Sequence, residues 1–270
     1  MLKASYTSFL LVLICALAGS QSAGAGNDLH QQTAAAVLNQ FKDSDVSFIL
    51  LNDSGDVQTQ RWENADKQIP IGSLAKPFLA VAYLEGHRDP PSFTCKGQKT
   101  CWYPRGHGRL SMREAIAFSC NSYFHQLDKY NDHAAVAGTL NQYGLGPQSD
   151  GYNGSATPVA LARAYLELIK HRSQPELAPV YDGMAMSFSR GTASPASKAM
   201  PSYMTALAKT GTASCTHGRK FLADGFTVLL FPADHPRMVL LVREHGHQGA
   251  QAAAIAGQMV AAMEGAGQPR

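Results

Sequence analysis

The sequence has little charge of either sign and no run of lysines or arginines. Charged residues make up 16% of the chain, and 23 basic against 20 acidic residues leave a formal net charge of +3. Proteins that bind nucleic acid or anionic membranes through electrostatics need clustered basic residues. We therefore expect no nucleic-acid partner. No internal repeat or low-complexity tract is present, and a 45% hydrophobic content excludes a disordered or collagen-like chain.

Long hydrophobic segments are also missing after the N-terminus. The apolar run from Phe9 to Ala18 follows Lys3 and precedes Ala23-Gly24-Ala25, which supplies the small residues of a signal-peptidase site. As a helix the run is about 15 Å long, too short for a bilayer core of about 30 Å. We expect residues 1–25 to be a signal peptide cleaved near Ala25. The mature chain, residues 26–270, is then one periplasmic or secreted domain without a membrane anchor. Lipidation of Cys15 is the alternative interpretation.

Four cysteines remain in the expected mature chain, which is too few for a disulfide-built scaffold. Cys95 and Cys101 lie in one short polar stretch, CKGQKTC, and an oxidising compartment favours a disulfide between them. A second bond between Cys120 and Cys215 is the weaker hypothesis. Zinc is the alternative for four cysteines, but no second short cysteine pair is present, so we expect no metal site.

The pattern of apolar residues predicts strands near both ends of the chain and helices in the middle. The expected strands are residues 47–51, 57–61, 205–214, 225–231 and 238–244. The expected helices are residues 27–41, 73–86, a segment capped by Ser111 and Glu114, 122–130, 157–170 and 248–263. Residues 90–108 are expected to form a loop. This order predicts an α+β fold, with a sheet built from both ends of the chain and a mainly helical insert.

The first candidate site motif is Ser73-Leu74-Ala75-Lys76. Residues three apart share a helix face, so the Ser73 hydroxyl can meet the Lys76 amine. A serine hydroxyl needs a base beside it to act as a nucleophile, and a desolvated lysine can serve as that base near neutral pH. Pro77 removes a backbone donor, so the first turn is expected to be irregular. Taken alone, the motif is also typical of an exposed helix start.

Two further motifs are unspecific when taken alone and indicate a site only together with the first. Ser119-Cys120-Asn121 is expected to be extended, so that Ser119 and Asn121 point the same way; alone it resembles an ordinary capping turn. Lys209-Thr210-Gly211-Thr212 lies on an expected strand, where the glycine allows another chain to approach closely.

Together and in this order, the three motifs resemble the signature of the penicillin-recognising serine acyl-transferases. The chain is similar to the transpeptidase domain of class B penicillin-binding proteins over roughly residues 48–259. Further matching segments are residues 70–77 (PIGSLAKP), 101–108 (CWYPRGHG), 111–124 (SMREAIAFSCNSYF), 143–146 (YGLG), 156–162 (ATPVALA), 191–193 (GTA), 209–213 (KTGTA) and 231–233 (FPA).

The resemblance implies an antiparallel sheet flanked by helices and a helical subdomain. It also implies catalysis by Ser73, Lys76 and Ser119, with Asn121, Lys209, Thr210, Gly211 and Thr212 binding substrate. The expected activity is D,D-transpeptidase or D,D-carboxypeptidase action on D-Ala-D-Ala-type peptidoglycan stem peptides. Ser73 would form an acyl-enzyme, with the Ser73 and Thr212 backbone N–H groups as oxyanion hole. β-Lactams would be covalent ligands, and no cofactor is expected. The sequence identifies no protein partner.

Two other functions remain open at this stage. One is a class D-like β-lactamase, although that family usually has an aliphatic residue where Asn121 stands and an asparagine where Leu145 stands. The other is a binding module that recognises β-lactams or muropeptides without turnover. Glu167 lies near where a class A β-lactamase carries its deacylating glutamate, but we interpret it as a surface residue. Trp102, Tyr103 and His107 are expected to shape the cleft rim or the helical subdomain.

Overall fold

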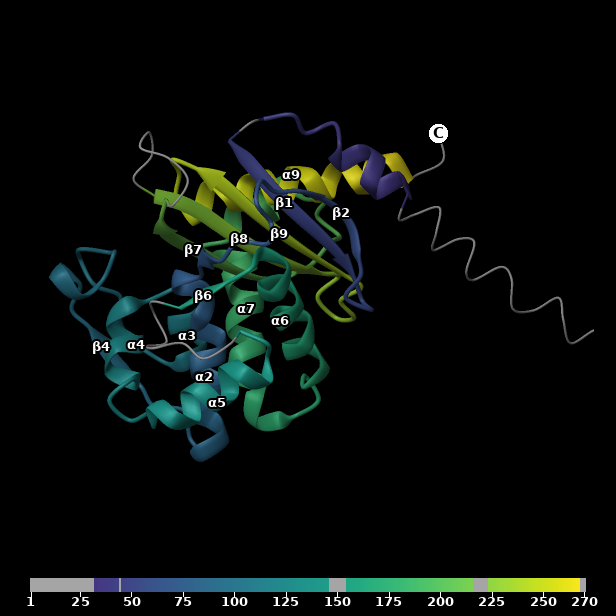
Figure 1. Ribbon diagram of the computed structural model, residues 1–270. Helices are drawn as coiled ribbons and strands as arrows, with labels where there is room; N and C mark the ends of the chain where they lie inside the picture. Colours follow the sequence, from purple (N-terminus) through teal and green to yellow (C-terminus); the bar gives the residue numbers. More distant parts are fainter. Residues whose placement is uncertain (1–31, 44, 146–153, 216–222, 268–270) are drawn as a thin grey trace, which may run out of the picture.

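The computed structural model describes residues 32–43, 45–145, 154–215 and 223–267, and its centre is a five-stranded antiparallel sheet (Figure 1). The strand order is β2-β1-β9-β8-β7. These strands are β1 (Val46–Asn52), β2 (Val57–Arg61), β7 (Leu207–Ser214), β8 (Ala223–Phe231) and β9 (Met238–His245). The prediction that both ends of the chain build the sheet is confirmed.

Both faces of the sheet are buried, which explains the near-continuous apolar runs of its central strands. In β1, Phe48 and Leu50 point into one core, whereas Ile49 and Leu51 point into the other. Residue 48 of β1 pairs with Val242 of β9, so neighbouring strands send side chains to the same core in register. The strand bounds agree with the predicted ranges to within a few residues.

Helices cover the two faces of this sheet (Figure 1). One core lies between the sheet, α8, α9 and the helical residues 32–38; the other lies between the sheet and the helical insert. The helices are α2 (Lys76–Gly86), α3 (Met112–Ala117), α4 (Asn121–Leu127), α5 (His133–Gln142), α6 (Pro158–Lys170), α7 (Ala178–Arg190), α8 (Ser194–Ala199) and α9 (Gly249–Gly267), with 3₁₀ turns η1 (Gly72–Ala75), η2 (Gln98–Thr100) and η3 (Pro175–Leu177).

Local capping signals set several helix starts as predicted. The Ser111 side chain accepts from the Glu114 backbone, and the Glu114 carboxylate accepts from the Ser111 backbone at 2.9 Å. Thr157 caps α6 through the backbone N–H of Ala160 at 3.2 Å, with Pro158 at the first helical position. The expected signal peptide and the start of the first predicted helix lie outside the described residues. Across the ranges described, no helix is both long and apolar enough to cross a membrane.

The stretch 90–108 is more ordered than predicted. It contains β4 (Phe93–Cys95), which pairs with β5 (Gly108–Leu110) as a hairpin, and η2 lies in the connection. Two further short strands, β3 (Ile69–Pro70) and β6 (Ser155–Ala156), pair with each other. Alternation of apolar residues is too short in β4 and β5 to indicate strands.

The expected disulfide between Cys95 and Cys101 is not formed in the structure, where both side chains are free. Cys120 and Cys215 are free as well, so the second predicted bond is also absent from the described residues. The hairpin brings Cys95 and Cys101 together with two other side chains, His107 and Cys120, rather than with each other alone.

Candidate active site

The first motif begins with an irregular turn, as Pro77 predicted. Residues Gly72 to Ala75 form η1, and α2 starts at Lys76. Gly72 has a φ of +48°, and a side chain there would lie 3.1 Å from the carbonyl oxygen of Thr212. Glycine therefore lets the turn that carries Ser73 pack directly against strand β7.

Lys76 is fully buried at the start of α2 and points at the second motif. Its Nζ donates to the Ser119 carbonyl at 2.8 Å, to Asn121 Oδ1 at 2.6 Å and to Ser119 Oγ at 3.3 Å. Three acceptors match the three protons of an ammonium group. Ser73 Oγ is not among the hydrogen-bond partners of Lys76 in the described part of the chain.

The second motif is a tight turn between α3 and α4, not the extended stretch that the sequence predicted. Ser119 has a φ of +50°, in the left-handed region that side-chain-bearing residues rarely adopt. Ser119 Oγ accepts from Lys209 Nζ at 2.8 Å as well as from Lys76. The strained turn thus places one hydroxyl between two lysines that come from distant parts of the chain.

The third motif occupies the edge strand β7. Gly211 lies against η1, where a side chain would meet Leu74 Cγ at 2.9 Å. On the other side of the strand, Gly249 at the start of α9 approaches the Gly211 backbone so closely that a Cβ would lie 2.5 Å from its oxygen. Glycines therefore allow η1, β7 and α9 to meet, as the sequence predicted for Gly211 but not for Gly249.

The two threonines of this motif have different hydrogen-bond states. Thr210 is buried and its hydroxyl donates to Thr192 Oγ1 at 2.6 Å, while Thr192 in turn reaches the Ala117 carbonyl at 3.4 Å. Thr212 is exposed, and its Oγ1 accepts from the backbone N–H of Gly249 at 3.1 Å. Because an accepting hydroxyl still carries its own proton, Thr212 can donate to a ligand.

A cavity of about 420 Å³ joins the three motifs. Its walls include Ser73, Trp102, Ser119, Asn121, Gly191, Thr192, Ser194, Pro195, Thr210, Gly211, Thr212, Gln248, Gly249 and Ala250. Lys76 and Lys209 are not on this wall, because both lie behind Ser119 with their side chains fully buried. The predicted substrate-binding residue Lys209 therefore contacts Ser119 and the Thr210 carbonyl, at 2.8 and 2.6 Å.

Burial also sets the protonation of the two lysines. Desolvation lowers the pKa of Lys76 from 10.5 to about 7, against smaller opposing effects of Cys120 and Cys101 nearby. Desolvation, reinforced by the charge of Lys76, holds the pKa of Lys209 well below its usual range. Two ammonium groups that share Ser119 Oγ repel each other, so the pair favours a state with at least one neutral amine.

Some of the lining residues could not be assigned from the sequence. Gln248, Gly249 and Ala250 begin α9, where nothing but a helix start was visible, and Ser194 and Pro195 begin α8, which was not predicted. Trp102 lines the cavity, in agreement with its expected place at the cleft rim. The GTA segment at residues 191–193 is one of the segments that resemble the family, and its Thr192 accepts a hydrogen bond from Thr210.

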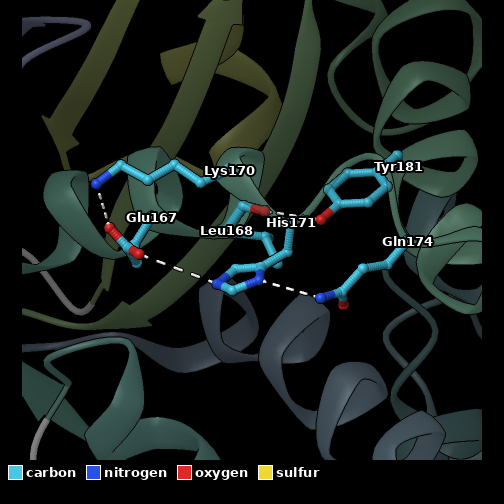
Figure 2. Close-up of polar contacts among 6 residues, drawn as sticks. All are labelled: Glu167, Leu168, Lys170, His171, Gln174 and Tyr181. Atoms are coloured by element: carbon cyan, nitrogen blue, oxygen red, sulfur yellow. Dashed lines mark hydrogen bonds and ion pairs between the residues drawn. The ribbon is translucent and has the colours of Figure 1, made fainter.

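Glu167 lies in α6 and is not among the residues that line this cavity. Its side chain is 38% exposed and forms an ion pair with Lys170 at 2.6 Å and a longer contact with His171 at 3.9 Å (Figure 2). His171 also contacts Gln174 at 3.3 Å. The interpretation of Glu167 as a surface residue agrees with this position, and Glu167 does not line the cavity that Ser73 faces.

Solved structures with the same fold come from several bacteria. Pseudomonas aeruginosa PBP2 in complex with WCK 5153 is 18% identical, with 87% of this chain and 76% of that chain covered and a TM-score of 0.70. The TP domain of Burkholderia pseudomallei penicillin-binding protein 3 is 18% identical, and the match covers 90% of this chain and 93% of that chain with a TM-score of 0.67. Helicobacter pylori PBP2, solved in complex with MreC, is 16% identical, and the match covers 86% of this chain and 62% of that chain with a TM-score of 0.70.

A search of curated proteins finds no match to this chain. The family model described as "Penicillin binding protein transpeptidase domain", by contrast, matches residues 34–262, which include all three motifs and every strand of the central sheet. The antiparallel sheet, the helical insert and the shared cavity agree with that match, and the chain belongs to the penicillin-binding protein transpeptidase domain family.

Proposed function

We propose that the protein is a serine D,D-acyl-transferase that acts on D-Ala-D-Ala-type peptidoglycan stem peptides in the periplasm or outside the cell. The observation that carries this proposal is the meeting of Ser73, Ser119 and Thr212 on one cavity wall, with two buried lysines behind Ser119. Family membership supplies the substrate class, and the cavity supplies a place for the reacting peptide end.

In the acylation step, Ser73 Oγ attacks the carbonyl carbon of the scissile peptide bond and its proton passes to neutral Lys76. As the family resemblance implies, we expect the backbone N–H groups of Ser73 and Thr212 to stabilise the developing oxyanion. The C–N bond then breaks, and the leaving amine takes the proton through Ser119, whose hydroxyl is 3.3 Å from Lys76 Nζ. Water or a second amine resolves the ester and regenerates Ser73.

The hydrogen bonds that the cavity residues already form indicate which of them can bind the substrate. Thr212 donates its remaining proton to the terminal carboxylate, whereas the Thr210 proton is already used by Thr192. Lys209 does not contact the substrate itself, because its Nζ donates to Ser119 Oγ and so positions that hydroxyl on the cavity wall. The Asn121 side chain holds the substrate amide with its NH₂ group while its oxygen accepts from Lys76.

The β-lactamase alternative is less well supported by the surroundings of Lys76. A lysine is carbamylated in class D enzymes within an apolar pocket, but here Asn121 Oδ1 lies 2.6 Å from Nζ and Ser119 supplies two more oxygen atoms. Among the described residues, no Asp or Glu lines the cavity as a class A-like deacylating base would, and Glu167 is paired at the surface. We therefore expect the acyl-enzyme to persist for minutes or longer.

Intact-mass spectrometry with a penicillin tests the proposal. A time course should give one covalent adduct on the wild type and none on Ser73→Ala, with nitrocefin turnover far below about 10 s⁻¹ even when bicarbonate is added. Glu167→Gln is the matched control and should label at the wild-type rate. Turnover near 10 s⁻¹ would instead favour a β-lactamase. A folded wild type that forms no adduct would favour a non-turnover binding module, and an adduct on Ser73→Ala would mean that another nucleophile reacts.

A further inference from the structure

Four potential metal ligands converge beside the second motif. The Sγ atoms of Cys95, Cys101 and Cys120 and a ring nitrogen of His107 all lie within 4.8 Å of one another. The three cysteines are buried and His107 is half-buried. His107 Nδ1 is 3.6 Å from Cys95 Sγ and 3.5 Å from Cys101 Sγ, and Cys101 Sγ is 3.9 Å from Cys120 Sγ.

These separations match the edges of a tetrahedron around zinc. With Zn–S near 2.3 Å and Zn–N near 2.05 Å, tetrahedral ligands lie about 3.8 Å apart for two sulfurs and about 3.5 Å apart for sulfur and nitrogen. We propose that Cys95, Cys101, His107 Nδ1 and Cys120 form a structural zinc site. Three thiolates with one imidazole are a ligand set that selects zinc over the oxygen-preferring magnesium and calcium.

The backbone around the cluster is built to bring the ligands together. Cys95 ends β4 opposite Gly108 at the start of β5, so the hairpin fixes Cys95 beside His107. The connection folds back on itself where Gly97 and Gly106 cross, both with positive φ; a Cβ on Gly97 would lie 2.3 Å from the Gly106 nitrogen. Such a crossing leaves no room for a side chain at either position, and Cys101 in the same connection is buried.

A disulfide accounts for less of this arrangement than a metal does. It would join two of the three thiols and leave the third buried next to an imidazole with only weak hydrogen bonds available. A tetrahedral ion uses all four donors at once and leaves no coordination position open. The other cluster in the described residues, Cys215 with Asp224 and His245, differs because His245 Nδ1 is already 2.7 Å from the Asp224 carboxylate.

The proposed metal would fix the geometry of the second motif. Cys120 lies between Ser119 and Asn121, and its Sγ also accepts from the backbone N–H of Tyr123 at the start of α4. The same hairpin connection carries Trp102, whose Nε1 donates to the Ser119 carbonyl at 3.2 Å and which lines the cavity. The ion would therefore position Ser119 and Asn121 without touching substrate, and its ligands are positioning residues.

Metal analysis of the purified wild-type protein, prepared without chelator, is the direct test. We expect one zinc ion per chain by inductively coupled plasma mass spectrometry. Replacement by Co²⁺ should give the intense d–d bands of a tetrahedral site together with thiolate-to-cobalt charge-transfer absorption. In zinc-loaded protein, alkylation should spare Cys95, Cys101 and Cys120 relative to metal-free protein, while Cys215 reacts equally in both and serves as internal control. A protein without affinity for Zn²⁺, or one with Cys95 and Cys101 disulfide-bonded, would overturn the proposal.

Variants separate the site from general folding. Cys101→Ser should lower zinc affinity by about 100-fold, and Cys215→Ser should leave it unchanged. His107→Cys should retain zinc with an all-sulfur cobalt spectrum, so a loss of metal in this variant would contradict the assignment of His107. Stripping zinc from the wild type should slow penicillin acylation about tenfold and adding Zn²⁺ should restore it. Because zinc content is measured independently of acylation, failure of this proposal and failure of the proposed activity give different results.

Discussion

The rate at which a penicillin acylates Ser73 should depend steeply on pH because of Lys76. Burial lowers the pKa of Lys76 to about 7, and only the neutral amine can accept the serine proton. At pH 5 about 1% of a base with this pKa is neutral, compared with nearly all of it at pH 9. We therefore expect the acylation rate to rise about 100-fold from pH 5 to pH 9, with its midpoint near pH 7.

Asn121→Asp should move this midpoint upward. The substitution keeps the shape of the side chain and places a carboxylate where Asn121 Oδ1 lies 2.6 Å from Lys76 Nζ. A close opposite charge stabilises the ammonium form and raises a lysine pKa by about 1 to 3 units, which slows acylation at pH 7 by about 5- to 500-fold. Asn121→Ser, which removes the amide without adding charge, should keep the midpoint near 7.

Stopped-flow measurement with a fluorescent penicillin gives the second-order acylation rate at each pH. Thermal unfolding recorded at the same pH values shows whether the protein stays folded over the range. A flat profile between pH 5 and 9, or an unchanged midpoint in Asn121→Asp, would show that Lys76 is not the base whose protonation limits acylation.

Three further predictions concern substrate binding, packing and the surface. Thr212→Val should lower the acylation efficiency of carboxylate-bearing β-lactams at least about tenfold, and more than Thr210→Val, because only Thr212 has a proton left for the ligand; equal losses would contradict this distinction. Gly249→Ala should destabilise the protein by about 2 kcal/mol or more in chemical unfolding, since its Cβ would lie 2.5 Å from the Gly211 oxygen, and an unchanged midpoint would disprove the close approach. Glu167→Gln weakens only partly exposed contacts with Lys170 and His171, so the free energy of unfolding should change by less than about 1 kcal/mol; a larger loss would mean that these are more than surface contacts.

Most of the fold could be predicted because its signals are local. Strands such as residues 238–244 are apolar on both faces, and Ser111 with Glu114 or Thr157 with Pro158 mark helix starts through hydrogen bonds within one turn. The hairpin of β4 and β5 was missed because its strands are too short for periodicity and its connection is rich in glycine and cysteine. Chain reversal there depends on backbone crossings that no local pattern reports.

The candidate site was predictable as a set of residues but not in its geometry. The three motifs identify Ser73, Ser119 and Thr212, yet the left-handed backbone of Ser119 depends on packing around the turn. Spacing could not indicate that Lys209 lies behind Ser119, since the two are joined only through the folded insert. The cysteines illustrate the same limit, because Cys95 and Cys101 look like a pair in sequence whereas Cys120 joins them from another element.

The pairing of β1 with β9 has a consequence for how the chain reaches its native state. Val46 lies opposite Glu244, and the core beneath these strands is closed by Met259 and Val260 of α9. Contacts so distant in sequence must wait for loop closure, which slows folding, and they cannot form until the C-terminal strands and helix have been synthesised. During synthesis, Ser73 and Lys76 are therefore made long before the C-terminal strands that complete the sheet. We expect fragments that end before β9 to remain open to proteases, so that the ability to react with a penicillin arises only once the last helix is available.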